Sequence, residues 1–156
     1  MPIRDQQKIR RAAVAGRFYE GEALDLRRRM AETEAQLPPV SGRKDATVRG
    51  CILPHAGYLF SLGVAMETMR EARQGKYRNV VLLGPSHYIG FHGVAGSTFT
   101  SWRTPFGDLS TALSLQDKLE QSGNPLFQIS DAAHAQEHSL EVEFPLVQYF
   151  LGSPEI

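Results

Sequence analysis

The sequence has one cysteine, no long apolar run and no net charge, and each absence excludes a class of protein. Because Cys51 is the one cysteine, no internal disulfide can form, which suits a reducing compartment. No stretch approaches the ~20 consecutive apolar residues of a membrane span. The first residues, Met1 to Arg11, are polar and lack the apolar core of a signal peptide. We therefore expect a cytoplasmic protein with no membrane partner.

The charges balance, with 17 Lys and Arg against 17 Asp and Glu, so no nucleic-acid partner is expected. The run Arg27-Arg28-Arg29 is interpreted as the solvated face of a helix rather than a phosphate-binding patch. Hydrophobic residues make up 42% of the chain and charged residues 22%, as in an ordinary globular protein. A chain of 156 residues is too short for two ordinary domains, so residues 1–156 are expected to form one.

A βαβ unit is predicted in the first half of the chain. Apolar residues at spacings of three and four predict a helix over 22–37, which ends at Pro38-Pro39. Val48 to Leu53 is a strand candidate, and a helix is expected over about 61–73. The apolar run of 79–83 then suits a strand that is covered on both faces, as in a parallel sheet.

The second half predicts two more strands and two more helices. The strands are expected over 94–99 and 126–129, and a helix over about 109–121 with Asp108 as its N-cap. The tail is helical in pattern over 137–151, with Pro145 marking a kink or the start. Together these elements predict an α/β fold with an open, mostly parallel sheet and helices on both faces. Three or four strands are fewer than a doubly wound domain usually has.

Two histidines follow the two strands of the predicted βαβ unit. His55 lies in Pro54-His55-Ala56-Gly57-Tyr58 and His87 ends Gly84-Pro85-Ser86-His87. The carboxyl ends of neighbouring parallel strands meet at one edge of a sheet, so both imidazoles should converge there. Neutral imidazole is the commonest transition-metal ligand, which favours a metal-binding pair. The alternative is that each histidine caps a strand end by bonding to backbone.

A second cluster contains His134, His138 and Glu141, whose spacings of four and three place them on one face if the segment is helical. The order His-x-x-Glu-His is that of inverted zinc proteases. A second interpretation is a pocket wall in which a carboxylate orients an acid/base histidine. A third is a polar helix N-terminus with no role in chemistry. His92 is expected to be merely exposed, and Cys51 to fill the core.

Five segments occur together in the order and rough spacing of the Memo family, which the chain resembles from about residue 10 to residue 150. They are Ala13-Val14-Ala15-Gly16-Arg17-Phe18-Tyr19, Pro54-His55-Ala56-Gly57-Tyr58, Leu83-Gly84-Pro85-Ser86-His87, Trp102-Arg103-Thr104-Pro105-Phe106-Gly107 and Glu137-His138-Ser139-Leu140-Glu141-Val142. Each segment alone is a weak signal, but five in order are specific.

The resemblance implies a fold like that of class III extradiol dioxygenases, with His55 and His87 as ligands of a divalent transition metal. Iron is the expected metal, with copper and zinc as alternatives. The remaining site residues are His138 as a catalytic acid/base group and four that line the pocket, namely Tyr58, Ser86, His134 and Glu141. Memo-family proteins continue well past this point and supply a third ligand from their later half. The chain therefore resembles a domain truncated on its C-terminal side, which a partner chain could complete.

Three functions follow from these features. The first is a non-haem iron-dependent oxidoreductase acting on a small molecule. The second is a non-catalytic adaptor that binds a metal, a peptide or a small ligand, since a shared fold does not fix a function. The third is an incomplete domain without activity of its own.

Overall fold

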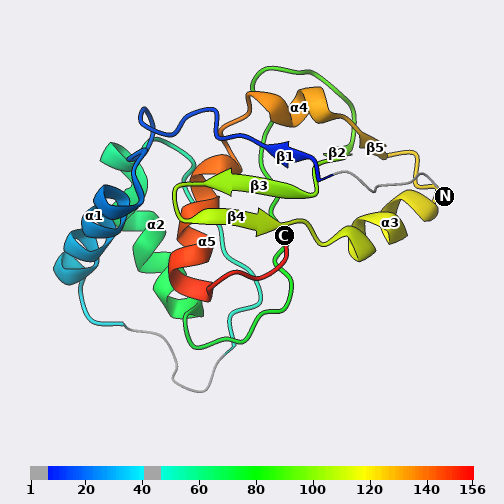
Figure 1. The fold of residues 1–156 in the computed structure, drawn as a ribbon. Helices are drawn as coiled ribbons and strands as arrows, with labels where there is room; N and C mark the ends of the chain where they lie inside the picture. The colour runs from blue at the N-terminus through cyan, green and yellow to red at the C-terminus, as the bar shows by residue number, and fades with distance from the viewer. Residues whose placement is uncertain (1–6, 41–46) are drawn as a thin grey trace.

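The computed structural model describes residues 7–40 and 47–156, and it shows an α/β fold with open sheets. Helices α1 (Ala23–Gln36) and α2 (Tyr58–Ala72) pack together, and α2 packs on α5 (Phe144–Leu151). Figure 1 shows α1 and α2 at one side of the molecule and α5 behind a small sheet. The side chains between these helices form the main core, including Val14, Tyr19, Leu26, Met30, Tyr58, Leu62, Met66, Leu146 and Phe150.

The strands of the described residues are divided between two small sheets. In the first, β1 (Ile9–Arg10) pairs in parallel with β3 (Ser101–Thr104), and β3 pairs antiparallel with β4 (Gly107–Ser110). In the second, β2 (Val94–Gly96) pairs in parallel with β5 (Phe127–Ile129). The expectation of open and mostly parallel pairing is thus confirmed, although the strands do not form a single sheet.

The remaining helices are short. They are α3 (Leu113–Gln121), α4 (Asp131–Ala135) and the 3-10 turn η1 (Glu141–Glu143), which leads directly into α5. Pro145 occupies the first turn of α5, where a missing N–H costs nothing, so it marks a helix start as the sequence allowed. Among the described residues, no helix has the length and apolar character needed to cross a membrane.

The two strands of the predicted βαβ unit are not observed as strands. Residues 48–53 and 80–83 carry no strand assignment, and Asn79 forms only an isolated bridge with Glu155. A strand is defined by its neighbours, and these two stretches have no ladder partner among the described residues. The prediction of two strands paired in a parallel sheet at 48–53 and 79–83 is therefore wrong for the described residues.

The hairpin β3–β4 was not predicted. It occupies the residues at which the helix expected over 109–121 was to begin. Gly107 has φ of 108° at the turn, a conformation that glycine adopts without a steric cost. Asp108 therefore lies in β4, where it pairs with Arg103, and does not cap a helix. The helix expected from residue 109 begins instead at Leu113.

Candidate metal centre

Three imidazoles meet at one place: His55, His87 and His138 each offer a nitrogen within 4.8 Å of those of the other two. The ring centroids of His55 and His87 are 5.3 Å apart, which confirms that the two motif histidines converge. The ring of His138 stacks on that of His87 at 4.4 Å and lies 6.0 Å from that of His55. The sequence assigned His55 and His87 as the ligand pair and His138 as an acid/base group of the same pocket, and the fold brings the three imidazoles together.

Each histidine stands at the end of a different segment. His55 lies two residues before Gly57, the N-cap of α2, and His87 follows residues 80–86, which form neither helix nor strand. His138 lies in the irregular turn between α4 and η1. The prediction that His134, His138 and Glu141 share one helix face is therefore wrong, because the helix stops at Ala135.

Gly84 allows the His87 segment to approach the His138 turn. A Cβ added at Gly84 would lie 2.7 Å from Ser139 Oγ and 2.8 Å from Leu140 Cδ2, closer than a side chain tolerates. The Ser139 hydroxyl also donates to the Pro85 carbonyl at 2.8 Å, which fastens the two segments together. A larger residue at Gly84 would push His87 away from His138.

The Glu137 carboxylate is hydrogen-bonded to both segments that carry His87 and His138, a role that the sequence did not reveal. Its carboxylate accepts from the backbone N–H of His87 at 2.6 Å and from His87 Nδ1 at 2.8 Å. It also accepts from the backbone N–H groups of His138 and Ser139, both at 2.9 Å. Burial alone would raise the pKa of Glu137, but these hydrogen bonds outweigh it and hold the pKa at about 2. The only sequence signal was its position directly before His138.

The hydrogen bond to Glu137 fixes which nitrogen of His87 is free. Because Nδ1 bonds to the carboxylate, Nε2 is left for a metal, the usual arrangement of a ligating histidine. Burial lowers the pKa of His138, and the neighbouring rings of His87 and His55 lower it further, against the opposing charge of Glu137. Neutral imidazole is the form that binds metals.

The donor set fits a transition metal. Imidazole suits iron, copper and zinc, and metal–nitrogen bonds of about 2.0–2.1 Å place ligating nitrogens roughly 3–4 Å apart. The observed limit of 4.8 Å is slightly wider, so a bound metal would require the three nitrogens to move closer together by small side-chain rotations. His87 is 39% exposed in its side chain, which leaves one side of the cluster open.

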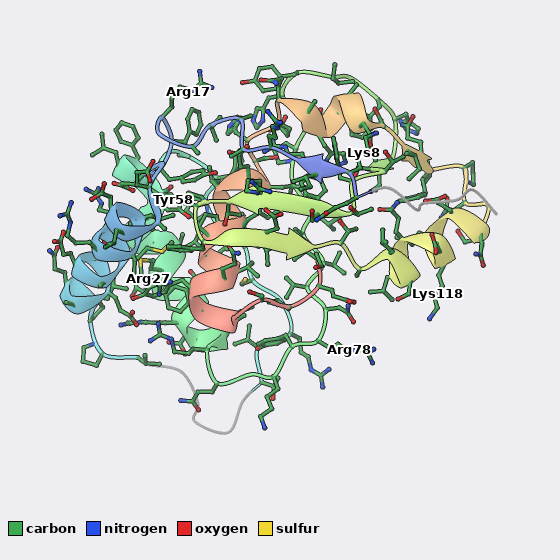
Figure 2. All side chains as sticks on the ribbon, in the orientation of Figure 1. Lys8, Arg17, Arg27, Tyr58, Arg78 and Lys118 are labelled. Carbon is green, nitrogen blue, oxygen red and sulfur yellow. The ribbon has the colours of Figure 1, made fainter. Side chains whose placement is uncertain are left out.

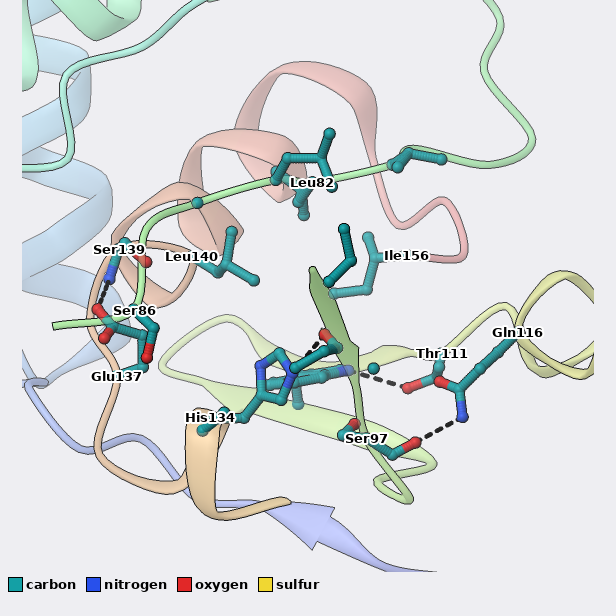
Figure 3. A pocket seen from close by; sticks show the side chains of 18 of the residues that line it. Leu82, Ser86, Ser97, Thr111, Gln116, His134, Glu137, Ser139, Leu140 and Ile156 are labelled. Atoms are coloured by element: carbon teal, nitrogen blue, oxygen red, sulfur yellow. Dashed lines mark hydrogen bonds between the residues drawn. The ribbon is translucent and has the colours of Figure 1, made fainter. Parts of the chain in front are cut away.

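Two cavities flank the cluster and share the wall 80–85. The first has a volume of about 380 Å³ and is lined by Ser86, His134 and Glu137 among others. Figure 3 shows His134 entering it from α4, opposite Leu82, Leu140 and Ile156. The second has a volume of about 580 Å³, and its lining includes His55, Cys51 and Glu143.

Of the other residues expected to line the pocket, Ser86 and His134 line the first cavity, whereas Tyr58 and Glu141 line neither cavity. Tyr58 is buried in the core, where its hydroxyl donates to the Val142 carbonyl at 2.7 Å (Figure 2 labels it). Ser86 donates to the Ile89 carbonyl at 2.7 Å, and His134 Nε2 bonds to the Ala95 carbonyl at 3.0 Å. His92 is exposed as expected. Cys51 is exposed too, so its assignment to the core is wrong, because its segment is not covered by a sheet.

Glu141 lies in a closed polar network outside both cavities. It is 1% exposed and pairs with Arg10, which is 2% exposed. Its carboxylate also accepts from the backbone N–H groups of Ala13 and Val14 and from the Tyr19 hydroxyl, at 2.8–3.0 Å. Burial, together with Glu141, raises the pKa of Tyr19 well above its ordinary value. Arg10 in turn donates to the carbonyls of His134 and Glu137 at 2.6–3.1 Å, so the network anchors the segment that carries His138.

The open α/β fold brings three imidazoles together, which places this chain in the class of proteins with a candidate three-histidine metal site. The family model described as Memo-like protein matches residues 10–156, and the chain therefore belongs to the Memo family.

Curated relatives support the same family. The MEMO1 family protein of Methanococcoides burtonii is 34% identical over 145 residues, 93% of this chain and 51% of the relative. The MEMO1 family protein MTH_45 of Methanothermobacter thermautotrophicus is 35% identical over 149 residues, 91% of this chain and 53% of the relative. Protein memo-1 homolog of Caenorhabditis elegans is 30% identical over 148 residues, 94% of this chain and 41% of the relative. The chain spans about half the length of the curated relatives it matches.

Proposed function

We propose that the cluster of His55, His87 and His138 binds a divalent transition metal, which we expect to be iron, with copper or zinc as alternatives. We propose further that the chain is part of a cytoplasmic non-haem iron-dependent oxidoreductase. The observation that carries the proposal is that three imidazole nitrogens from separate segments lie within 4.8 Å of one another. Its finer part, the iron and the redox activity, rests on the resemblance to class III extradiol dioxygenases.

Each residue of the cluster has a separate proposed role. His55 and His87 hold the metal, and Glu137 sets the ring orientation of His87 by accepting from its Nδ1. His138 serves either as the third ligand or as the acid/base group that moves a proton to or from a bound substrate. Bound Fe(II) would supply the redox chemistry. The open side beside His87 admits a small molecule.

Metal content tests the proposal. Protein purified without oxygen and reconstituted with Fe(II), Cu(II) or Zn(II) should hold close to one equivalent by plasma mass spectrometry. His55→Ala and His87→Ala should each lose it, whereas His92→Ala, an exposed histidine outside the cluster, should keep it. A wild-type protein that stays free of metal after all three reconstitutions would end the proposal.

The same experiment separates the two roles of His138. If it is a ligand, His138→Ala loses metal as the other two variants do. If it moves a proton, His138→Ala keeps the metal and loses turnover, measured as oxygen uptake with catechol-like substrates. Metal binding without oxygen uptake in the wild type would support a binding role in place of an oxidoreductase.

Glu137→Ala should weaken metal binding by about 10–100-fold, because partners that orient a ligating histidine contribute about that much. Glu137→Gln keeps the shape and one acceptor oxygen, and its loss should be smaller. Titration of the apoprotein with Zn(II) against a chelator of known affinity measures both. Equal affinity in Glu137→Ala and wild type would show that Glu137 does not position His87.

A further inference from the structure

The cavity of about 580 Å³ has a buried carboxyl group in its wall, that of Glu143. Glu143 is 6% exposed, and neither of its carboxylate oxygens has a hydrogen-bond partner among the described residues. Burying a carboxyl group without partners costs free energy, because the group loses the water that would otherwise bind it. Such groups are uncommon in folded proteins, and one explanation for them is a bound molecule that supplies the partner.

The neighbouring glutamates of the same segment show the contrast. The Glu141 carboxylate pairs with Arg10 and accepts from two backbone N–H groups. The Glu137 carboxylate accepts from the His87 imidazole at 2.8 Å. For Glu143, burial raises the pKa to about 8, and within the described ranges neither a hydrogen bond nor a nearby cation lowers it again. Glu143 therefore lacks the positive partner that an ionised buried carboxylate requires.

The rest of the wall is mainly apolar. Its apolar side chains include Leu53, Met69, Ala72, Val147 and Leu151. Arg49 also belongs to the lining, but it is exposed and forms no hydrogen bond with Glu143. Ligand pockets commonly combine apolar walls with a few polar groups that fix the orientation of the ligand. A largely apolar chamber with one unpartnered carboxyl group favours an apolar molecule that carries one positively charged donor.

We propose that this cavity binds a small molecule that carries a primary amino group on an apolar body. The ammonium group pairs with Glu143, and the apolar body lies against the apolar side chains of the wall. An ammonium group supplies three N–H donors together with the positive charge, whereas a hydroxyl group supplies one donor and no charge. Both carboxylate oxygens are shielded in this structure, so the carboxyl group turns toward the ligand by rotation about its own side-chain bonds.

Ligand binding to the metal-free chain tests this site independently of the proposed function. The probes are benzylamine and benzyl alcohol, which are similar in shape and differ in charge. They are titrated to ~10 mM, and the shifts of the backbone amide signals are followed by NMR. Benzylamine should bind at least about tenfold more tightly, because charge-assisted hydrogen bonds are the stronger ones. Equal affinities, or no binding of benzylamine, would overturn the proposal.

Two glutamate variants test the role of the carboxylate. Glu143→Gln keeps the shape of the side chain and removes its charge, so it should weaken benzylamine binding at least about tenfold. Glu67→Gln, at an exposed position of α2, should keep the wild-type affinity. Circular dichroism melts check that both variants fold, and the comparison of the two probes on the unaltered chain decides if either does not. Unchanged affinity in folded Glu143→Gln would contradict the assignment.

Cys51 reports where benzylamine binds, because it is the one cysteine of the chain and lines the same cavity. It is exposed, so it can react with dithiobis(nitrobenzoate), a thiol reagent that does not consume amines. Bound benzylamine should slow this reaction, and an unchanged rate would place the amine elsewhere and refute the site.

Metal content separates this proposal from the proposed function. A chain that binds metal but not benzylamine would overturn the amine site alone. A chain that binds benzylamine in this cavity but takes up no metal would support the amine site and end the metal proposal.

Discussion

Replacing Glu141 by alanine is expected to destabilise the chain by about 3–5 kcal/mol, because it leaves Arg10 as a buried charge without a partner. The backbone N–H groups of Ala13 and Val14 and the Tyr19 hydroxyl would lose their acceptor at the same time. For a domain of this size the loss corresponds to a fall in Tm on the order of 10 °C. Thermal unfolding followed by circular dichroism measures it.

The exposed pair Arg103–Asp108 gives a matched control. Arg103 is 52% exposed, and exposed pairs contribute about 0–1 kcal/mol, so Asp108→Ala should shift Tm only slightly. The double variant Arg10→Met/Glu141→Leu should be more stable than Glu141→Ala, since it removes both charges together. A Tm for Glu141→Ala as high as that for Asp108→Ala would show that the buried network does not hold the fold.

Stability should fall as the pH rises from about 5 to 8, because of Glu143. This side chain is 6% exposed, and neither carboxylate oxygen has a hydrogen-bond partner among the described residues. Burial raises its pKa from 4.5 to about 8. The unfolded chain gives up this proton near pH 4.5 while the folded chain keeps it until about pH 8. The folded state therefore binds more protons across that window, and raising the pH disfavours it.

The loss is up to roughly 4 kcal/mol between pH 5 and 8, as an upper bound from the size of the shift. Glu143→Gln carries no titrating proton and should flatten the Tm-against-pH curve, while the exposed Glu67→Gln should leave its slope unchanged. Tyr58 and Cys51 lie near Glu143, but burial, and then Glu143 itself, raises their pKa values, so neither titrates in the window. Parallel curves for Glu143→Gln and wild type would refute the prediction.

The sequence by itself determined the local structure and the chemistry of two site residues. The spacing of Leu26 and Met30 predicted a helix over 22–37, which is observed as α1 with both side chains buried. Such signals are local, because a helix closes its hydrogen bonds within its own segment. The convergence of His55 and His87 was also predicted and is observed, although the parallel sheet on which the prediction rested is not formed by the described residues.

Only the tertiary structure decided the rest. His138 joins the cluster because α4 ends at Ala135 and a turn redirects the chain, which the helical spacing of His134 and His138 had concealed. Glu137 and Glu141 look alike in sequence, yet one holds the histidines and the other neutralises Arg10, more than a hundred residues away. Whether 79–84 becomes a strand depends on a neighbour, because strand hydrogen bonds join separate segments. The local sequence pattern determines which secondary structure a segment can form. Contacts with residues far away in the sequence determine whether it forms and which site its side chains join.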